Sequence, residues 1–167
     1  MKAFMDKDFM LQSATAQHLY HDYAAAMPIC DYHCHIPPRE IYENRRFENI
    51  TQVWLGGRNP DGSYFGDHYK WRVMRSNGVP EEYITGDKPD RERFQKFAEA
   101  LPMAIGNPMY HWTNLELHVF FGYDGVLNGD TAEEVWNLCN DKLQHDPKMT
   151  VRGLIEQSNV AMVGTTD

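Results

Sequence analysis

The sequence has no long apolar run and too few cysteines for a disulfide framework. No stretch approaches the ~18 consecutive apolar residues that span a bilayer, and the polar start MKAFMDKDF lacks the apolar segment of a secretory signal. Cys30, Cys34 and Cys139 are an odd number of cysteines, which we interpret as packed free thiols in a reducing compartment. These absences predict a soluble, cytoplasmic protein that does not bind a membrane.

Positive charge is also scarce, because 16 Lys and Arg face 24 Asp and Glu and the formal net charge is −8. Contacts with nucleic-acid phosphates need a clustered excess of Lys and Arg, which this sequence lacks. We therefore expect no nucleic-acid partner and a small molecule instead. An anionic substrate would need local arginines that work against the overall negative charge.

Apolar residues make up 42% of the 167 residues, enough to bury a core in one domain or in part of a larger one. Helical patterns dominate the chain. Segment 11–27 has Ser13 as its candidate N-cap and Pro28 as its stop signal. Stretch 88–105 carries one amphipathic stripe, formed by Phe94, Phe97, Ala98 and Leu101. Further helices are predicted over 38–47, 67–78, 107–122 and 131–143, and an exposed loop is predicted over 56–67.

Two apolar, β-prone segments bracket these helices: 29–35, which Pro37 and Pro38 end, and 159–167. The pattern predicts an α/β fold with a mostly helical insertion, roughly 38–158, between two strands. Two strands alone are only marginally stable, and a buried parallel strand needs neighbours. We therefore expect the sheet to continue beyond this chain.

The segment PICDYHCHIPP, residues 28–38, contains two histidines one residue apart. Side chains alternate along a strand, so Asp31, His33 and His35 share one face and the Cβ atoms of the two histidines are about 7 Å apart. Two imidazoles in this position can bind one metal ion at the carboxyl end of a strand, where α/β folds bind their ligands. The alternative is a pair of partly buried histidines satisfied by hydrogen bonds within the protein.

Three other interpretations of nearby residues are weaker. A zinc finger formed by Cys30, His33, Cys34 and His35 would need ligands from both faces of the strand. His18 and His21 lie three residues apart on a helix and could share an ion, but a solvated helix face explains them as well. Asp31 could orient a ligand histidine, or it could serve in strand-end hydrogen bonding.

A second polar group lies in GDHYKWRVMR, residues 66–75, on the helix that we expect Asp67 to cap. Helical spacing places Tyr69, Arg72 and Arg75 on one face with His68 nearby, which combines a phenol, an imidazole and two guanidinium groups suited to a carboxylate. The alternative is a surface helix that packs Trp71 and Met74 inward.

Four blocks together resemble one family. DYHCHIPPREIYENRRFENI, GDHYKWRVMRSNGV, IGNPMYHWTNLELHVFFG and NVAMVGTTD are similar, in this order, to segments of uronate isomerase, the glucuronate/galacturonate isomerase of the amidohydrolase superfamily. The resemblance runs from about residue 10 to the last residue. It implies the amino-terminal portion of a distorted (β/α)8 TIM-like barrel with a large, mostly helical insertion between its first two strands.

The resemblance also implies site residues and chemistry. His33 and His35 would be two ligands of a divalent metal, usually zinc, after the first strand. Tyr69 would bind substrate and handle a proton, and His68 would line the same pocket. Arg72 and Arg75 would be structural or would support the site indirectly, rather than hold the substrate carboxylate. The substrates would be D-glucuronate and D-galacturonate, converted to D-fructuronate and D-tagaturonate, and the full-length protein is expected to be a homo-oligomer.

The sequence departs from the family in two places. Segment 56–65 is longer than usual, which enlarges a loop beside the expected pocket. The chain stops inside what is normally TTDDP, before the remaining metal ligands and the arginines that grip the carboxylate, so we expect residues 1–167 alone to be an inactive amino-terminal part. Two other hypotheses stay open: another metal-dependent amidohydrolase, or a helical binding module without catalysis.

Overall fold

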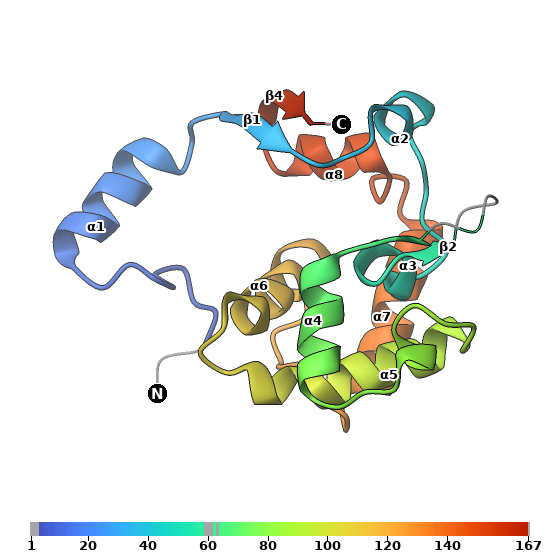
Figure 1. Cartoon of the computed structure of the whole chain (residues 1–167). Coiled ribbons are helices and arrows are strands. Elements are labelled where there is room, and N and C mark those ends of the chain that lie inside the picture. The colour runs from blue at the N-terminus through green and yellow to red at the C-terminus, as the bar shows by residue number, and fades with distance from the viewer. Residues whose placement is uncertain (1–3, 59–61, 63, 167) are drawn as a thin grey trace. The chain divides into compact units, whose positions relative to one another are not determined.

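The computed structural model describes residues 4–58, 62 and 64–166. The chain divides into two compact units (Figure 1). Residues 1–46 and 147–167 form what we call the sheet unit, and residues 47–146 form the helical unit. No helix in the described part of the chain is both long enough and apolar enough to cross a membrane.

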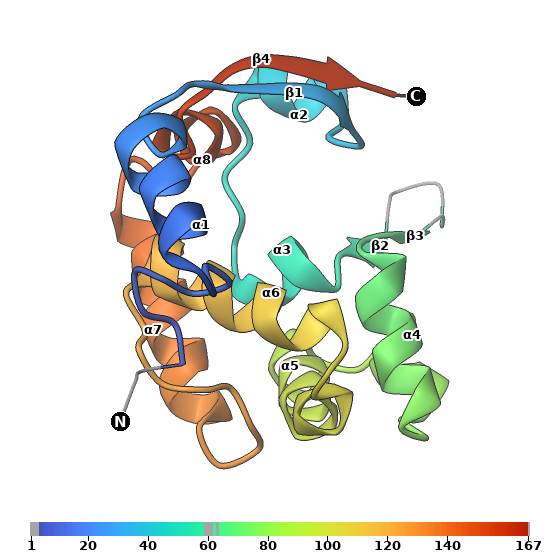
Figure 2. The ribbon, with the colours of Figure 1, turned by 90° about the vertical axis from the view of Figure 1, so that its left-hand side faces the viewer.

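The sheet unit is an α/β unit built around one parallel pair of strands, β1 (Ile29–Cys34) and β4 (Val160–Thr165). Figure 2 shows the two strands side by side and pointing the same way. The helix α8 (Val151–Gln157) packs along β4 and touches α2 (Pro38–Glu43). Both predicted strands are therefore confirmed, and they pair directly with each other.

Short-range signals account for the helix ends of the sheet unit. Ser13 caps α1 (Ala14–Leu19) by accepting a hydrogen bond from the Ala16 N–H at 3.1 Å, as predicted. A π-helical turn, η1 (Tyr20–Ala24), continues α1, so the helical segment ends before Pro28. Pro38 occupies the first turn of α2, and Asn44 ends that helix in the left-handed conformation with φ 50°.

The sheet unit leaves much of its apolar surface exposed. Tyr32 is 84% exposed, and Ile29 and Met162 are each 50% exposed, although all three lie in strands. Among the described residues of this unit, the buried apolar side chains are Met149 and Val151. A two-stranded sheet cannot cover its own faces, which gives the physical reason for this exposure.

The helical unit contains nearly all of the buried core. Its elements in chain order are α3 (Ile50–Trp54), β2 (Gly57–Arg58), β3 (Tyr64–Phe65), α4 (His68–Ser76), η2 (Glu81–Tyr83), α5 (Asp90–Ala100), η3 (Leu101–Ala104), α6 (Pro108–Glu116), η4 (Leu117–Phe121) and α7 (Ala132–His145). Helix α5 is central, since it packs against α3, α4 and α7. The predicted stripe on α5 is confirmed, because Phe94, Phe97 and Ala98 are at most 1% exposed and Leu101, in η3, is 0% exposed.

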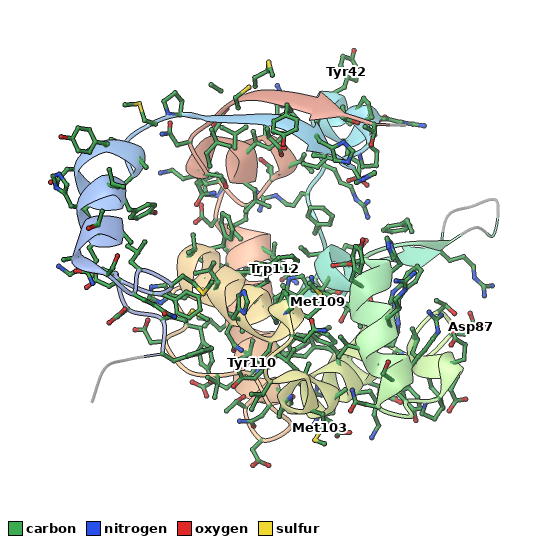
Figure 3. All side chains as sticks on the ribbon, turned by 60° about the vertical axis from the view of Figure 1, so that its left-hand side comes forward. Tyr42, Asp87, Met103, Met109, Tyr110 and Trp112 are labelled. Atoms are coloured by element: carbon green, nitrogen blue, oxygen red, sulfur yellow. The ribbon has the colours of Figure 1, made fainter. Side chains whose placement is uncertain are left out.

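Helix α6 shows how burial follows helical position in this unit. Met109 is 6% exposed and joins a cluster with Val73 and Ala104, whereas Trp112 on the same helix is 49% exposed (Figure 3). The π-helical turn η4 then carries the chain to Gly122, whose φ of 71° favours glycine at this helix end. The predicted helix 107–122 is therefore confirmed, with a change of helical type in its last turn.

Two sequence-based predictions need correction. Segment 56–67 contains a short antiparallel ribbon as well as loop, because Gly57–Arg58 pairs with Tyr64–Phe65. Residues 59–61 and 63 lie outside the described residues.

The cysteines are free, but only Cys139 is buried, where burial raises the pKa of its thiol to about 12. Cys34 is half-buried and Cys30 is exposed, because the strand that carries Cys30 and Cys34 has an uncovered face.

Candidate functional site

His33 and His35 come together at the end of β1. Their ring centroids are 5.1 Å apart, and the ring planes cross at 84°. Both residues are exposed, which differs from the alternative of a partly buried pair satisfied by hydrogen bonds within the protein. The pair presents two imidazoles side by side at the carboxyl end of a parallel strand, where ligand sites of α/β folds lie.

Thr166 contacts His35 from the end of the neighbouring strand. Its Oγ1 lies 3.1 Å from Nδ1 of His35 and 3.2 Å from the carbonyl oxygen of Cys34. A hydroxyl has one hydrogen, so when Thr166 donates to the carbonyl its oxygen accepts from the Nδ1–H of His35. That tautomer leaves the Nε2 lone pair of His35 available to a metal. Thr166, rather than Asp31, therefore takes the orienting position on this histidine.

The donors at this site fit part of a metal centre. Among the described residues, no group of three or more His, Cys, Asp and Glu side chains is arranged to hold a metal ion. That statement covers the zinc-finger set Cys30, His33, Cys34 and His35. A catalytic zinc takes about three protein ligands, and neutral imidazole suits zinc and related ions. His33 and His35 therefore supply two suitable donors, and further ligands have to come from elsewhere.

The second histidine pair, His18 and His21, does not converge on a common point. Nδ1 of His18 lies 2.5 Å from Oδ2 of Asp22, and Nε2 of His21 lies 2.8 Å from Oδ1 of Asp8. Each imidazole thus has its own carboxylate partner, Asp22 on the same helical segment and Asp8 in the preceding turn. This arrangement matches the solvated helix face and gives no support to a shared ion.

In the helical unit, His68, Tyr69 and Arg72 stack along the first turns of α4. The ring centroids of His68 and Tyr69 are 4.2 Å apart with the planes tilted by 34°, and the Arg72 guanidinium lies 5.7 Å from the Tyr69 ring centroid. Tyr69 is 54% exposed, and His68 and Arg72 are exposed too. The opposite side of α4 packs inward through Val73 and Met74. The helix therefore has one packed face and one exposed polar face, so the two interpretations of this segment hold together.

Asp67 fixes the start of α4, as the sequence predicts. Its Oδ1 accepts the backbone N–H of Tyr69 at 2.8 Å, and its Oδ2 lies 3.0 Å from Nζ of Lys70. Burial raises the pKa of Asp67, but the charge and hydrogen bonds of Lys70 and the N–H of Tyr69 outweigh it, so the net pKa is below the ordinary value. Asp67 is therefore a charged cap directly under the exposed pair His68 and Tyr69.

Arg75 is engaged away from this stack. Its guanidinium grips Glu81, with Nε to Oε2 at 2.9 Å and Nη2 to Oε1 at 2.5 Å, and the hydroxyl of Thr85 donates to the same carboxylate. The Arg75 hydrogen bond, together with that of Thr85, lowers the pKa of Glu81 to about 2. This ion pair ties the end of α4 to the following turn, in line with the structural role predicted for Arg75.

Replacement of Glu81 by glutamine is expected to destabilise the chain by less than about 1 kcal/mol at pH 7, because the ion pair is exposed to solvent. The folded pKa of Glu81 lies below its ordinary value of 4.5, so its contribution is present above that pH and is lost as the pH falls toward about 2. Urea unfolding of both proteins at pH 7 and pH 3 should show the difference shrinking in acid. Glu92→Gln is the matched control, since Glu92 has no ion pair among the described residues. A difference that grows on acidification would contradict the assignment.

The structure thus assembles two groups of predicted residues, each within one unit. His33 and His35 belong to the sheet unit, and His68 and Tyr69 belong to the helical unit. A hollow of about 540 Å³ in the sheet unit, at the start of α8, is lined by residues such as Asn44, Arg152 and Glu156 and contains none of the predicted site residues.

The sequence patterns did not indicate Thr166 or Lys70. The i, i+3 spacing of Asp67 and Lys70 could have indicated their ion pair.

Comparisons with known proteins give one consistent result. A family model described as glucuronate isomerase matches residues 1–167. Proteins named uronate isomerase from Lachnospira eligens, Lachnoclostridium phytofermentans and Bacillus subtilis are 70%, 60% and 52% identical to the chain. Each match covers 100% of this chain and 33–34% of the relative. The chain therefore spans about a third of the length of these relatives.

Solved structures lead to the same family. The crystal structure of uronate isomerase from Thermotoga maritima matches with a TM-score of 0.86 and 34% identity over 99% of this chain and 34% of that one. The crystal structure of glucuronate isomerase from Caulobacter crescentus matches with a TM-score of 0.80 over 98% of this chain, at 24% identity. The latter likeness supports the fold alone.

Proposed function

The chain belongs to the glucuronate isomerase family, and we propose that, within a polypeptide of its relatives' length, it catalyses aldose–ketose isomerisation of hexuronates. The observation that carries this proposal is the family match over all 167 residues, together with 70% identity to a protein named uronate isomerase. The proposed conversions are D-glucuronate to D-fructuronate and D-galacturonate to D-tagaturonate. Homo-oligomer formation and a cytoplasmic location stay predictions.

The proposed architecture is a distorted (β/α)8 barrel, to which β1 and β4 contribute neighbouring parallel strands. The exposed Tyr32, Ile29 and Met162 support this proposal, because further strands and helices of a barrel would cover apolar sheet faces of this kind. In this arrangement the helical unit is an insertion between the two strands. His33 and His35 then lie at the barrel end that carries the active sites of such folds.

We propose that His33 and His35 hold a divalent metal ion, with zinc as the first candidate. When bound, the ion supplies Lewis-acid stabilisation of negative charge on a sugar oxygen. The protein's own contribution is orientation: Thr166 holds the ring of His35 through Nδ1, and the one-residue spacing at the end of β1 brings His33 beside it. Because no third His, Cys, Asp or Glu among the described residues joins these two donors, we infer that residues 1–167 alone lack isomerase activity.

Tyr69 and His68 are the proposed substrate-contacting residues of the helical unit. Isomerisation moves a proton from C2 to C1 of the sugar through an enediol-like intermediate, so a group that donates and accepts a proton has to contact the substrate. The Tyr69 hydroxyl can do both. The ring is exposed and held between His68 and Arg72, so its hydroxyl is available to a ligand without a rearrangement of α4.

The proposal is tested by expressing the 167-residue chain and the polypeptide extended to the relatives' length, each with zinc, and following D-glucuronate by proton NMR. The extended protein should form the ketose, and residues 1–167 alone should not. D-glucose, which lacks the C6 carboxylate, serves as the control substrate and should stay unchanged. Absence of ketose with a folded, zinc-loaded extended protein would refute the proposed activity.

A further inference from the structure

Lys70 is a buried cation in the middle of three helices. It is 5% exposed, although it lies on α4 only one residue after the exposed Tyr69. Its Nζ is 3.0 Å from Oδ2 of Asp67 and 4.0 Å from Oε1 of Glu116 on α6. It also lies 5.8 Å from the ring centroid of Trp54 on α3. A lysine is rarely buried unless it is paired, so these contacts are what permits its position.

Glu116 completes this group from the opposite helix. Its Oε2 accepts the indole N–H of Trp54 at 2.6 Å, which fixes the carboxylate beside the ammonium of Lys70. Burial raises the pKa of Glu116, and the charge of Lys70 together with the Trp54 hydrogen bond offsets only part of that effect. A well-packed apolar group in this place would often be at least as stable as a buried ion pair. General stability is therefore a poor explanation for the charges.

Asp67 connects these charged groups to Tyr69, the proposed catalytic residue. Asp67 uses one carboxylate oxygen for Lys70 and the other for the backbone N–H of Tyr69. The Tyr69 side chain is exposed on the helix surface and stacks on His68, so its position depends chiefly on the backbone of this first turn. A shift of Lys70 would move Asp67, and a shift of Asp67 would move the turn that carries both rings.

We propose that Lys70 is a positioning residue for Tyr69 and His68, acting through Asp67 and held in place by Glu116 and Trp54. This inference rests on the proposed function, because it assigns a role in the reaction that Tyr69 is proposed to serve. Lys70 touches neither substrate nor metal in this assignment. Lys70 fixes the position and rotation of the first turn of α4. Catalysis is sensitive to displacements of about 1 Å in the groups that contact the substrate.

The test is a double-mutant cycle in the full-length, zinc-loaded enzyme, with Lys70→Met, Tyr69→Phe and the double variant. Methionine keeps the aliphatic volume of lysine and removes the charge. Lys70→Met should lower kcat by about 10- to 100-fold while KM changes by less than about threefold. Because Lys70 acts through Tyr69 and His68, Lys70→Met should lower kcat by a much smaller factor in the Tyr69→Phe background than in the unmodified enzyme. NMR at high enzyme concentration measures the residual rates.

Two further variants separate positioning from folding. Lys142→Met is the matched control, since Lys142 is a half-buried lysine of the helical unit that donates to the carbonyl of Phe120 at 2.8 Å; its kcat should be unchanged. Asp67→Asn keeps an amide oxygen that can cap α4 but weakens the link to Lys70, and it remains informative where Lys70→Met does not fold. Asp67→Asn should also lower kcat, and by a smaller factor in the Tyr69→Phe background than in the unmodified enzyme.

The outcomes distinguish the two proposals. If Tyr69→Phe abolishes turnover and Lys70→Met or Asp67→Asn leaves kcat unchanged, the positioning role is wrong and the proposed function stands. The positioning role is also wrong if the losses of kcat multiply in the double variants. Multiplied losses correspond to free-energy changes that add, which is the behaviour of independent residues. If Tyr69→Phe is fully active, the proposed role of Tyr69 fails, and the role of Lys70 fails with it.

Discussion

Replacement of both His33 and His35 by alanine, in a polypeptide of the relatives' length, is expected to prevent binding of the proposed metal and to abolish the proposed isomerase activity. The ring centroids of the two imidazoles are 5.1 Å apart. The two side chains would supply two of the roughly three protein ligands that a catalytic zinc requires. Loss of a residue that merely supports a ligand costs roughly 10- to 100-fold, so loss of two ligands should exceed that range. Metal content by mass spectrometry and conversion of D-glucuronate measure the two effects separately.

His18 and His21 provide the matched control for this experiment. The double variant His18→Ala, His21→Ala removes the same number of imidazoles from the same unit, but each of these histidines is paired with a separate carboxylate, Asp22 or Asp8. Its metal content and turnover should equal those of the unmodified enzyme. One equivalent of zinc and full activity in the His33→Ala, His35→Ala variant would refute the metal role outright.

Tyr69→Phe is expected to lower kcat of the full-length enzyme by about 10²- to 10⁴-fold with little change in KM. The substitution deletes only the hydroxyl, and the ring can keep its contacts with His68 and Arg72. The capping bond from Asp67 goes to the backbone N–H of Tyr69, so the helix start is retained. The effect should therefore report on proton handling rather than on folding, as measured by steady-state kinetics with D-glucuronate.

Tyr42→Phe is the control for the loss of a phenol. Tyr42 lies on α2, is 86% exposed and is labelled in Figure 3. Its variant should have unchanged kcat and KM. Equal turnover by Tyr69→Phe and Tyr42→Phe would contradict the proposed role of Tyr69, whereas a raised KM with unchanged kcat in Tyr69→Phe would restrict that role to substrate binding.

Local features of the fold followed from the sequence because their causes act within one or two turns of chain. The caps Ser13 and Asp67, the proline-terminated strand at Ile29–Cys34 and the apolar stripe of α5 all depend on neighbours a few residues away. The ribbon formed by β2 and β3 escaped prediction, since a segment dense in Gly, Asn and Asp is typical of loops. Helix α8 carries only seven residues and gave too short a pattern to recognise.

The candidate site also has a part that the sequence indicated and a part that it did not. The His-x-His spacing and the GDHY block were visible as motifs, and together with the other blocks they indicated the family to which the chain belongs. The contact of Thr166 with His35 and the environment of Lys70 were not visible. Glu116 and Trp54 reach Lys70 from other helices, and no local pattern reveals contacts between residues so far apart in the chain.

By itself, the sequence determined where the longer helices and the strand β1 begin, that His33 and His35 lie together at the end of that strand, and which family the chain resembles. Only the tertiary structure decided that the two strands pair in parallel, that Cys30 is exposed, and that Lys70 is buried between two carboxylates and an indole. The physical reason is range. Backbone conformation responds to nearby residues, whereas burial and charge pairing depend on which distant surfaces meet.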